Sequence, residues 1–221
     1  MRGNELFSRA LALIYPEKCP FCGAILPYGA GVCAGCAKRL PRADCRVPLG
    51  ALPNGEGLLC VAPFLYRDEV RAAVGRFKFH AHTEYALSFA AEMKKTLEQC
   101  AKGRTFDRIT CVPMLPEREA RRGYNQAELL ARALGRRLGI PYEALLVQTR
   151  AKKEQHTLTQ EERAANVRGV YAPKAPSRIC GRRILLCDDI VTTGSTLREC
   201  GRVLCRAGAE EVFCAAFAAV D

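Results

Sequence analysis

Short apolar runs alternate with longer amphipathic segments along residues 58–221 of the chain. The short runs predict β-strands at 58–65, 109–112, 183–187 and 212–218. Between them, apolar residues at helical spacing predict helices at 83–99, 125–138 and 195–206. Strands that alternate with helices predict an α/β fold, in which a parallel sheet is flanked by helices on both faces.

The middle helix has the best-marked limits. Asn125 is a typical N-cap, and Glu128 has the spacing of a capping box. Gly139 followed by Pro141 predicts the end of this helix. Residues 148–168, in contrast, are polar and lack an apolar stripe. Because a loop of that length inside a compact domain is usually functional, we expect it to contribute to a binding site.

Residues 1–58 do not share this periodicity. They are rich in Gly and Pro and contain too little apolar sequence for a core of their own, so stabilisation by a metal is expected. We therefore predict a small zinc-ribbon-like module with a leading helix over 1–58, followed by the α/β domain over 59–221.

Four cysteines of the N-terminal region form two close pairs. Ten residues separate one Cys-x2-Cys pair from the other, the pairs being Cys19 with Cys22 and Cys33 with Cys36. Four thiolates satisfy the tetrahedral coordination of zinc and leave no open position, so the ion would be structural. An iron–sulfur cluster is the main alternative. The other nine of the thirteen cysteines are scattered, and most are expected to pack as small apolar side chains.

The chain is basic, with 34 Lys and Arg against 23 Asp and Glu and a formal net charge of +11. This charge favours polyanionic partners such as phosphate esters or nucleic acid, although a basic surface without a partner has the same composition. Proteins that bind single strands usually have aromatic residues among the basic ones, and this chain has few there. No apolar run approaches the ~20 residues that span a bilayer, and Met1–Tyr15 lacks the apolar core of a signal peptide. We expect a cytoplasmic protein without membrane insertion.

The most informative segment is ILLCDDIVTTGST at 184–196, where an apolar strand leads into two aspartates and a polar loop before a helix. Backbone N–H groups at such a helix N-terminus carry partial positive charge and can hold a phosphate. The loop residues expected to do so are Thr192, Thr193, Gly194, Ser195 and Thr196.

Asp188 and Asp189 are expected at the carboxyl end of the strand, where ligands of open α/β sheets bind. Carboxylates there can accept hydrogen bonds from vicinal sugar hydroxyls. A phosphate site beside hydroxyl acceptors describes a ribose 5-phosphate. In the alternative interpretation, the segment is a strand–turn–helix corner whose Asp and Thr residues only cap the helix.

This segment resembles the phosphoribosyl pyrophosphate signature of type I phosphoribosyltransferases. Over nearly its full length the chain resembles the ComF family of competence-associated, phosphoribosyltransferase-like proteins. The supporting segments are Cys19-Pro-Phe-Cys22 with Cys33–Cys36, Tyr66 with Arg71, Phe77-Lys78-Phe79, Val112-Pro113, Arg122-Gly123-Tyr124-Asn125-Gln126, and Arg163 with Asn166.

The resemblance implies a type I phosphoribosyltransferase fold with an N-terminal zinc finger, and a role in DNA uptake beside a DNA-translocating helicase. It also implies that Val112-Pro113-Met114 lies where type I enzymes have their pyrophosphate loop, and that Arg163 with Asn166 matches a functional pair after a flexible segment. Many relatives have a further cysteine pair where this chain has Cys45 alone. Cys45 is therefore either a spare thiol or a ligand that replaces one of the four.

Basic residues near the predicted site have two interpretations. Arg118, Arg121 and Arg122 precede the helix at Asn125 and are candidates to hold pyrophosphate, or else form a solvated basic turn. Lys78 alternates with two apolar neighbours and is expected to point to solvent.

Three functions follow from these features. The first is transfer of a phosphoribosyl group from phosphoribosyl pyrophosphate to an unknown acceptor, with Mg²⁺ on the pyrophosphate and residues 150–166 as a lid. The second is a binding module that keeps the pocket without turnover. In the third, the basic surface and the zinc module hold single-stranded DNA.

Overall fold

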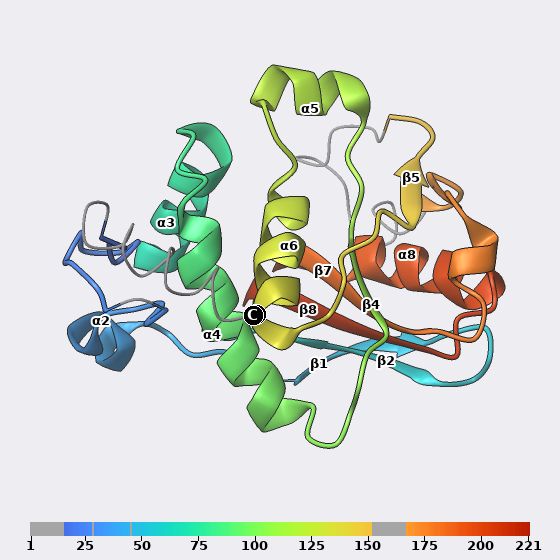
Figure 1. Ribbon diagram of the computed structural model, residues 1–221, viewed down its shortest axis with the longest axis horizontal. Coiled ribbons are helices and arrows are strands. Elements are labelled where there is room, and N and C mark those ends of the chain that lie inside the picture. The colour runs from blue at the N-terminus through green and yellow to red at the C-terminus, as the bar shows by residue number, and fades with distance from the viewer. Residues whose placement is uncertain (1–15, 28, 45, 152–166) are drawn as a thin grey trace.

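The computed structural model describes residues 16–27, 29–44, 46–151 and 167–221 (Figure 1). Within these residues, a six-stranded sheet runs in the order β1 (Arg46–Ala51), β2 (Gly57–Val61), β8 (Glu211–Ala219), β7 (Arg183–Val191) and β4 (Arg108–Cys111), and β3 (Phe64–Leu65) pairs with β8. Strand β1 is antiparallel to β2, and the other pairs are parallel. The sheet is therefore mixed, with a parallel centre as predicted.

Helices cover both faces of this sheet (Figure 1). One face packs against α3 (Asp68–Phe79), α4 (Tyr85–Cys100) and α6 (Gln126–Leu138). The other face packs against α8 (Ser195–Arg206) and a two-stranded sheet of β5 (Leu146–Gln148) and β6 (Tyr171–Pro173). The short elements are α2 (Ala34–Arg39), α5 (Pro116–Arg122) and the 3₁₀ turn η1 (Pro176–Arg178).

The two central strands explain the apolar runs of the sequence. In β7, Leu185 belongs to the cluster beneath α4 and α6, whereas Leu186 belongs to the cluster beneath α8. Phe213 and Cys214 of β8 divide in the same way. A strand buried on both faces needs apolar residues at successive positions, so it appears as a continuous apolar run.

Several predicted boundaries are confirmed and others are corrected. Helix α8 has the predicted limits, and the Asn125 side chain accepts the backbone N–H of Ala127 as the N-cap of α6. Glu128 does not form the predicted capping box at the start of α6. Its carboxylate instead accepts a hydrogen bond from Nε of Arg132 at 2.7 Å. The predicted strand at 58–65 is two strands, β2 and β3, interrupted at residues 62–63.

Strand β7 is longer than predicted. It continues through Asp188 and Asp189 to Val191, so the two aspartates lie within the last residues of the strand rather than after it. Two adjacent residues of a strand point to opposite faces. The longer strand therefore separates the directions of the two carboxylates.

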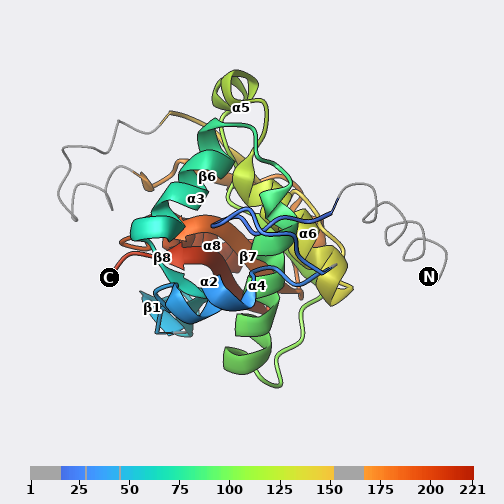
Figure 2. The same ribbon diagram turned by 90° about the vertical axis from the view of Figure 1, so that its left-hand side faces the viewer.

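The N-terminal segment packs against α4 and shares the main core (Figure 2). Its buried residues Cys19, Leu26 and Cys36 belong to the same apolar cluster as α3, α4 and α6. Arg42 pairs with the buried Glu92 of α4 at 3.1 Å. Nothing in the described ranges is a helix with the length and apolarity needed to cross a bilayer.

Candidate functional site

The four paired cysteines converge in the folded chain. The Sγ atoms of Cys19, Cys22, Cys33 and Cys36 all lie within 4.8 Å of one another. A tight turn forms the first pair: the N–H of Cys19 donates to the carbonyl of Ala24 at 2.8 Å, and that of residue 23 donates back to Cys19 at 2.9 Å. The second pair begins at the N-cap of α2, which is Cys33.

The thiols of the cysteine cluster differ in their electrostatic surroundings. The backbone N–H of Cys36 lowers the pKa of the Cys33 thiol to about 7, whereas burial raises the pKa of Cys36 to about 12. Arg39 offsets part of that burial by donating to the Cys36 sulfur at 3.5 Å. Zinc–sulfur bonds of ~2.3 Å give a tetrahedron whose edges are about 3.8 Å. The observed Sγ–Sγ distance of 3.6 Å between Cys22 and Cys33 fits that edge.

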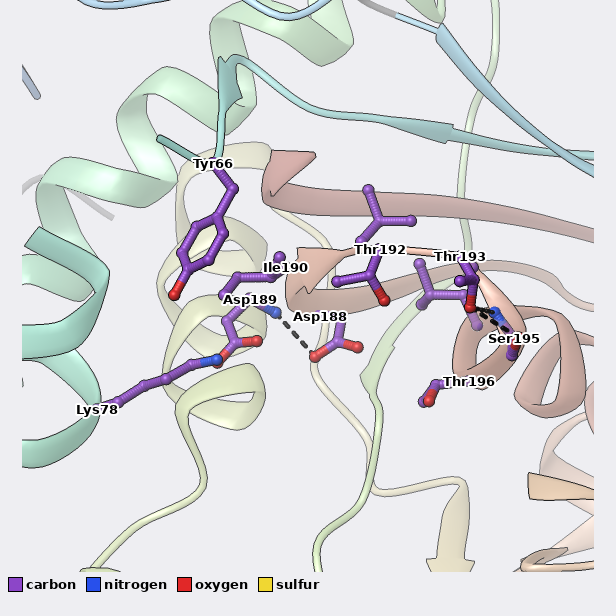
Figure 3. A pocket seen from close by; sticks show the side chains of 12 residues that line it. Tyr66, Lys78, Asp188, Asp189, Ile190, Thr192, Thr193, Ser195 and Thr196 are labelled. Atoms are coloured by element: carbon purple, nitrogen blue, oxygen red, sulfur yellow. Dashed lines mark hydrogen bonds and ion pairs between the residues drawn. The ribbon is translucent and has the colours of Figure 1, made fainter. Parts of the chain in front are cut away.

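A second site is a cavity of about 190 Å³ at the carboxyl edge of the parallel strands (Figure 3). Its walls come from four segments: residue 66 after β3, the last turn of α3, the end of β7, and the loop that leads into α8. The lining residues are Tyr66, Lys78, Asp188, Asp189, Ile190, Val191, Thr192, Thr193, Gly194, Ser195, Thr196 and Leu197. The structure thus brings both aspartates and the whole predicted phosphate loop into one cavity.

The phosphate loop has a specific backbone geometry. Gly194 is the N-cap of α8 with φ of +70°, a conformation that favours glycine. A Cβ at Gly194 would lie 2.3 Å from Cδ2 of Leu49 in β1, so a strand distant in sequence packs directly on the loop. The hydroxyls of Thr193 and Ser195 are 2.8 Å apart. The first amides of an α-helix have no intrahelical acceptor, so this end of α8 offers donors and positive partial charge to an anion.

The two aspartates have different surroundings. Oδ1 of Asp188 accepts the backbone N–H of Asp189 at 2.8 Å, and its carboxylate lies on the Thr192 side of the cavity (Figure 3). Asp189 is directed to the opposite end, where Oδ2 is 2.8 Å from Nζ of Lys78. That both carboxylates hold the sugar stays a prediction, to which the structure adds the ion pair of Asp189 with Lys78.

Lys78 corrects the expectation of an exposed side chain. It is only 20% exposed and reaches into the cavity. The expectation rested on the alternation of Lys78 with Phe77 and Phe79, whereas these residues form the last turn of α3, in which successive side chains point about 100° apart. The signal that identifies this helix is the spacing of four residues between Val70 and Val74, which are both buried on its inner face.

The remaining predicted residues are placed less directly. Val112-Pro113-Met114 follows β4 beside the site, and Val112 donates its N–H to Cys187 at 2.9 Å, but none of the three lines the cavity. The carbonyl of Val112 instead accepts from the Asn125 side chain at 3.1 Å. Arg163, Asn166 and Cys45 lie outside the described residues, as does most of the predicted lid at 150–166.

Of the three predicted arginines, Arg122 is closest to the site. Arg118 and Arg121 are exposed, whereas Arg122 is half-buried with its guanidinium 5.0 Å from the ring centre of Phe79. Burial lowers the pKa of Arg122, and the neighbouring charge of Arg118 lowers it further, whereas the Asp189 carboxylate raises it. Positive charge is therefore concentrated beside one end of the cavity.

Two family models match the chain. That of the phosphoribosyl transferase domain matches residues 120–221, and that of the double zinc ribbon domain matches residues 10–62. Adenine phosphoribosyltransferase from Saccharomyces cerevisiae is 15% identical, with a TM-score of 0.42 over 83% of this chain and 89% of that one. The domain matches, the sheet order and the cysteine cluster together define the class: a phosphoribosyltransferase-like α/β protein with an N-terminal zinc ribbon.

Relatives identify the family within this class. Competence protein F of Haemophilus influenzae is 30% identical over 88% of this chain and 81% of its own length. DNA utilization protein YhgH of Escherichia coli K12 is also 30% identical, over 90% of this chain and 96% of its own length. Competence protein ComFC of Bacillus subtilis is 30% identical over 66% of this chain and 57% of its own. The chain belongs to the competence protein F family.

Proposed function

We propose that the chain binds a 5-phosphoribosyl ligand, either phosphoribosyl pyrophosphate or a ribose 5-phosphate compound, and that it acts in DNA uptake in the cytoplasm. The observation that carries this proposal is the cavity at the end of β7, in which the phosphate loop and Asp188 face the same space. The names of the relatives support the role in DNA uptake.

Each part of the cavity has a role in this proposal. The N-terminus of α8 and the hydroxyls of Thr193 and Ser195 bind the terminal phosphate through backbone and side-chain donors. Asp188 accepts hydrogen bonds from the ribose hydroxyls. Mg²⁺ is usually held by one or two carboxylates and substrate phosphates, so Asp188 is the ligand suited to it; the ion would neutralise the pyrophosphate.

Transfer of the phosphoribosyl group to an acceptor is the second candidate. Lys78 and Arg122 favour it, because their charges lie beside the cavity, where departing pyrophosphate needs stabilisation. Arg163 is proposed to assist from the segment outside the described residues, and Val112-Pro113-Met114 to contact the pyrophosphate. Single-stranded DNA is a proposed partner, supported by the net charge of +11, and a DNA-translocating helicase is proposed from the family resemblance.

Calorimetric titration with phosphoribosyl pyrophosphate and Mg²⁺, and separately with ribose 5-phosphate, tests the binding proposal. We expect both ligands to bind the wild-type chain. Asp188→Asn should weaken each by about 10- to 100-fold, since hydrogen bonds to a charged group contribute roughly 1.5–3 kcal/mol. Its thermal midpoint should change little because Asp188 is half-buried at the cavity wall. Undiminished binding by the variant would show that Asp188 does not hold the ligand.

Release of pyrophosphate separates transfer from binding. The wild-type chain is incubated with phosphoribosyl pyrophosphate, Mg²⁺ and a panel of bases and amines, and pyrophosphate is measured enzymatically. Acceptor-dependent release that disappears in Asp188→Asn supports transfer. Tight binding without release supports a module that only binds its ligand.

A further inference from the structure

One aromatic side chain next to the cavity is exposed to solvent. Phe79, the last residue of α3, is 69% exposed, whereas Phe77 is fully buried and Lys78 lines the cavity. Among the large hydrophobic side chains that the described ranges expose, Phe79 is the one aromatic residue. Single exposed apolar side chains are common at protein surfaces, but Phe79 directly follows Lys78, which lines the cavity, so its ring is accessible to a ligand bound there.

Arg122 packs on this ring. Its guanidinium is 5.0 Å from the centre of the Phe79 ring, and it is close enough to Asp189 for their charges to interact. Asp189 itself lines the cavity. An aromatic ring and a guanidinium, both planar, thus lie together at the end of α3, where the neighbouring Lys78 lines the cavity. Planar nucleobases stack on both kinds of group.

Hydrogen bonds and packing hold this surface in place. The Tyr124 hydroxyl donates to the carbonyl of Phe77, which joins the segment after α5 to the last turn of α3. The Phe77 ring packs against Phe89 of α4 with centroids 5.3 Å apart. Because α3 and the α5–α6 connection are joined here, Phe79 and Arg122 are positioned before a ligand arrives, which lowers the entropy lost on binding.

We propose that Phe79 and Arg122 form a stacking platform for a nucleobase whose ribose and phosphate occupy the cavity. The ligand is then a nucleotide rather than a bare sugar phosphate. A free nucleotide and the terminal nucleotide of a single strand share this chemistry. The platform deepens the proposed function and rests on it, because the cavity must bind the phosphoribosyl part. A lone exposed Phe79 without ligand contact is the alternative, and the experiment below distinguishes the two.

The test compares three probes: ribose 5-phosphate, adenosine 5′-monophosphate, and a 5′-phosphorylated ten-residue oligodeoxyadenylate, each titrated at about 0.2 M salt, where purely electrostatic contacts weaken. For the wild-type chain we expect the nucleotide to bind more tightly than ribose 5-phosphate. Phe79→Ala should weaken nucleotide binding by about 5- to 150-fold, the usual contribution of one stacked base, and leave ribose 5-phosphate unchanged. Phe79→Tyr should retain wild-type affinity.

Leu87→Ala is the matched control, because Leu87 is another exposed apolar side chain, 39% exposed on α4. It should change no affinity. The platform is overturned if Phe79→Ala binds the nucleotide as the wild type does, or if the nucleotide binds no more tightly than ribose 5-phosphate. If ribose 5-phosphate binds and the platform variants have no effect, only this inference fails.

The other outcomes concern the source of the base and the proposed function. Tighter Phe79-dependent binding of the oligonucleotide than of the free nucleotide assigns the base to a single strand, and the reverse order assigns it to a free nucleotide. Phe79-dependent binding of the oligonucleotide alone overturns the proposed phosphoribosyl cavity and, with it, the platform as the base site of a nucleotide held in that cavity. No binding of any probe overturns both.

Discussion

The cysteine cluster and the phosphate loop obtain their shapes in opposite ways. The cluster brings together sulfur atoms of residues only 17 positions apart at most, from Cys19 to Cys36, and its segment contributes few residues to the core. The phosphate loop sits between β7, which is buried on both faces, and α8, whose inner face is buried, and Leu49 from another part of the chain packs on its Gly194. Side-chain chemistry thus specifies the first site, and backbone geometry supported by long-range packing specifies the second.

Loss of one zinc ligand should have the largest effect on folding, and it should unfold the cysteine region while the region of the phosphate loop stays folded. Structural zinc sites contribute on the order of 10 kcal/mol to folding. In Cys19→Ser we expect loss of bound zinc and unfolding of residues 16–44, while amides of β7 and α8 keep much of their protection. Elemental analysis and hydrogen exchange measure the two effects.

Cys180→Ser is the control for this experiment, since Cys180 is exposed and outside the cluster. It should retain one zinc per chain. Stoichiometric zinc in Cys19→Ser, or a folded cluster region after chelation, would show that the four cysteines do not form a structural metal site.

An added methyl group in the phosphate loop should disturb the second region alone. Gly194→Ala incurs roughly 1–2 kcal/mol of backbone strain at positive φ, and overlap with Leu49 adds about 1–3 kcal/mol. Gly181→Ala is matched, because Gly181 has φ of +64° with nothing within 4 Å of its Cβ position. We expect Gly194→Ala to lose more stability in urea and most of its ribose 5-phosphate binding, with zinc retained. Equal losses in the two variants would contradict the close packing of Leu49.

Acid should weaken the helix behind the phosphate loop through Glu199. Burial raises the pKa of this carboxyl, but Arg202 at 2.6 Å and the Gly169 amide at 2.8 Å outweigh burial, so the pKa lies below its ordinary value. A carboxyl with a lowered folded pKa stabilises the protein above its unfolded pKa of ~4.3, and this stabilisation is lost as the pH falls through the folded value.

Glu199→Gln should therefore cost about 1–3 kcal/mol at pH 7 and progressively less below about pH 4. Urea unfolding of the variant and the wild type across this range measures the difference. If the difference between the two chains is the same at pH 7 and at pH 3, the Glu199 charge does not contribute in this way.

The smallest expected effect concerns the contact between the two regions. Nη2 of Arg76 on α3 donates to the carbonyl of Pro20 in the first cysteine turn at 2.7 Å. Arg76→Gln should cost about 1 kcal/mol and speed zinc loss to a chelator by roughly five-fold. Arg71→Gln on the exposed side of the same helix should not change the rate of zinc loss. Equal rates for both variants would show that the contact does not stabilise the metal site.

The sequence predicts the parts of the two sites that depend on local pattern. Paired cysteines, the Asn125 cap and the limits of α8 all follow from spacing or composition over a few residues. The extension of β7 through Asp189 was missed, because charged residues at a strand end resemble a loop. The contacts of Lys78 and Leu49 could not be predicted, since they join segments separated by more than one hundred residues. Such contacts depend on how the layers pack, which no local pattern records.

The last turn of α3 has three consecutive side chains with three separate anchors. Arg76 reaches the cysteine turn, Phe77 is buried in the core, and Lys78 reaches Asp189. Successive helical residues project about 100° apart, so one rigid turn can serve all three directions. A rotation of this helix that broke one of the three contacts would displace the other two side chains. Binding or loss of zinc at the cysteine turn would then change the position of Lys78 in the ligand cavity.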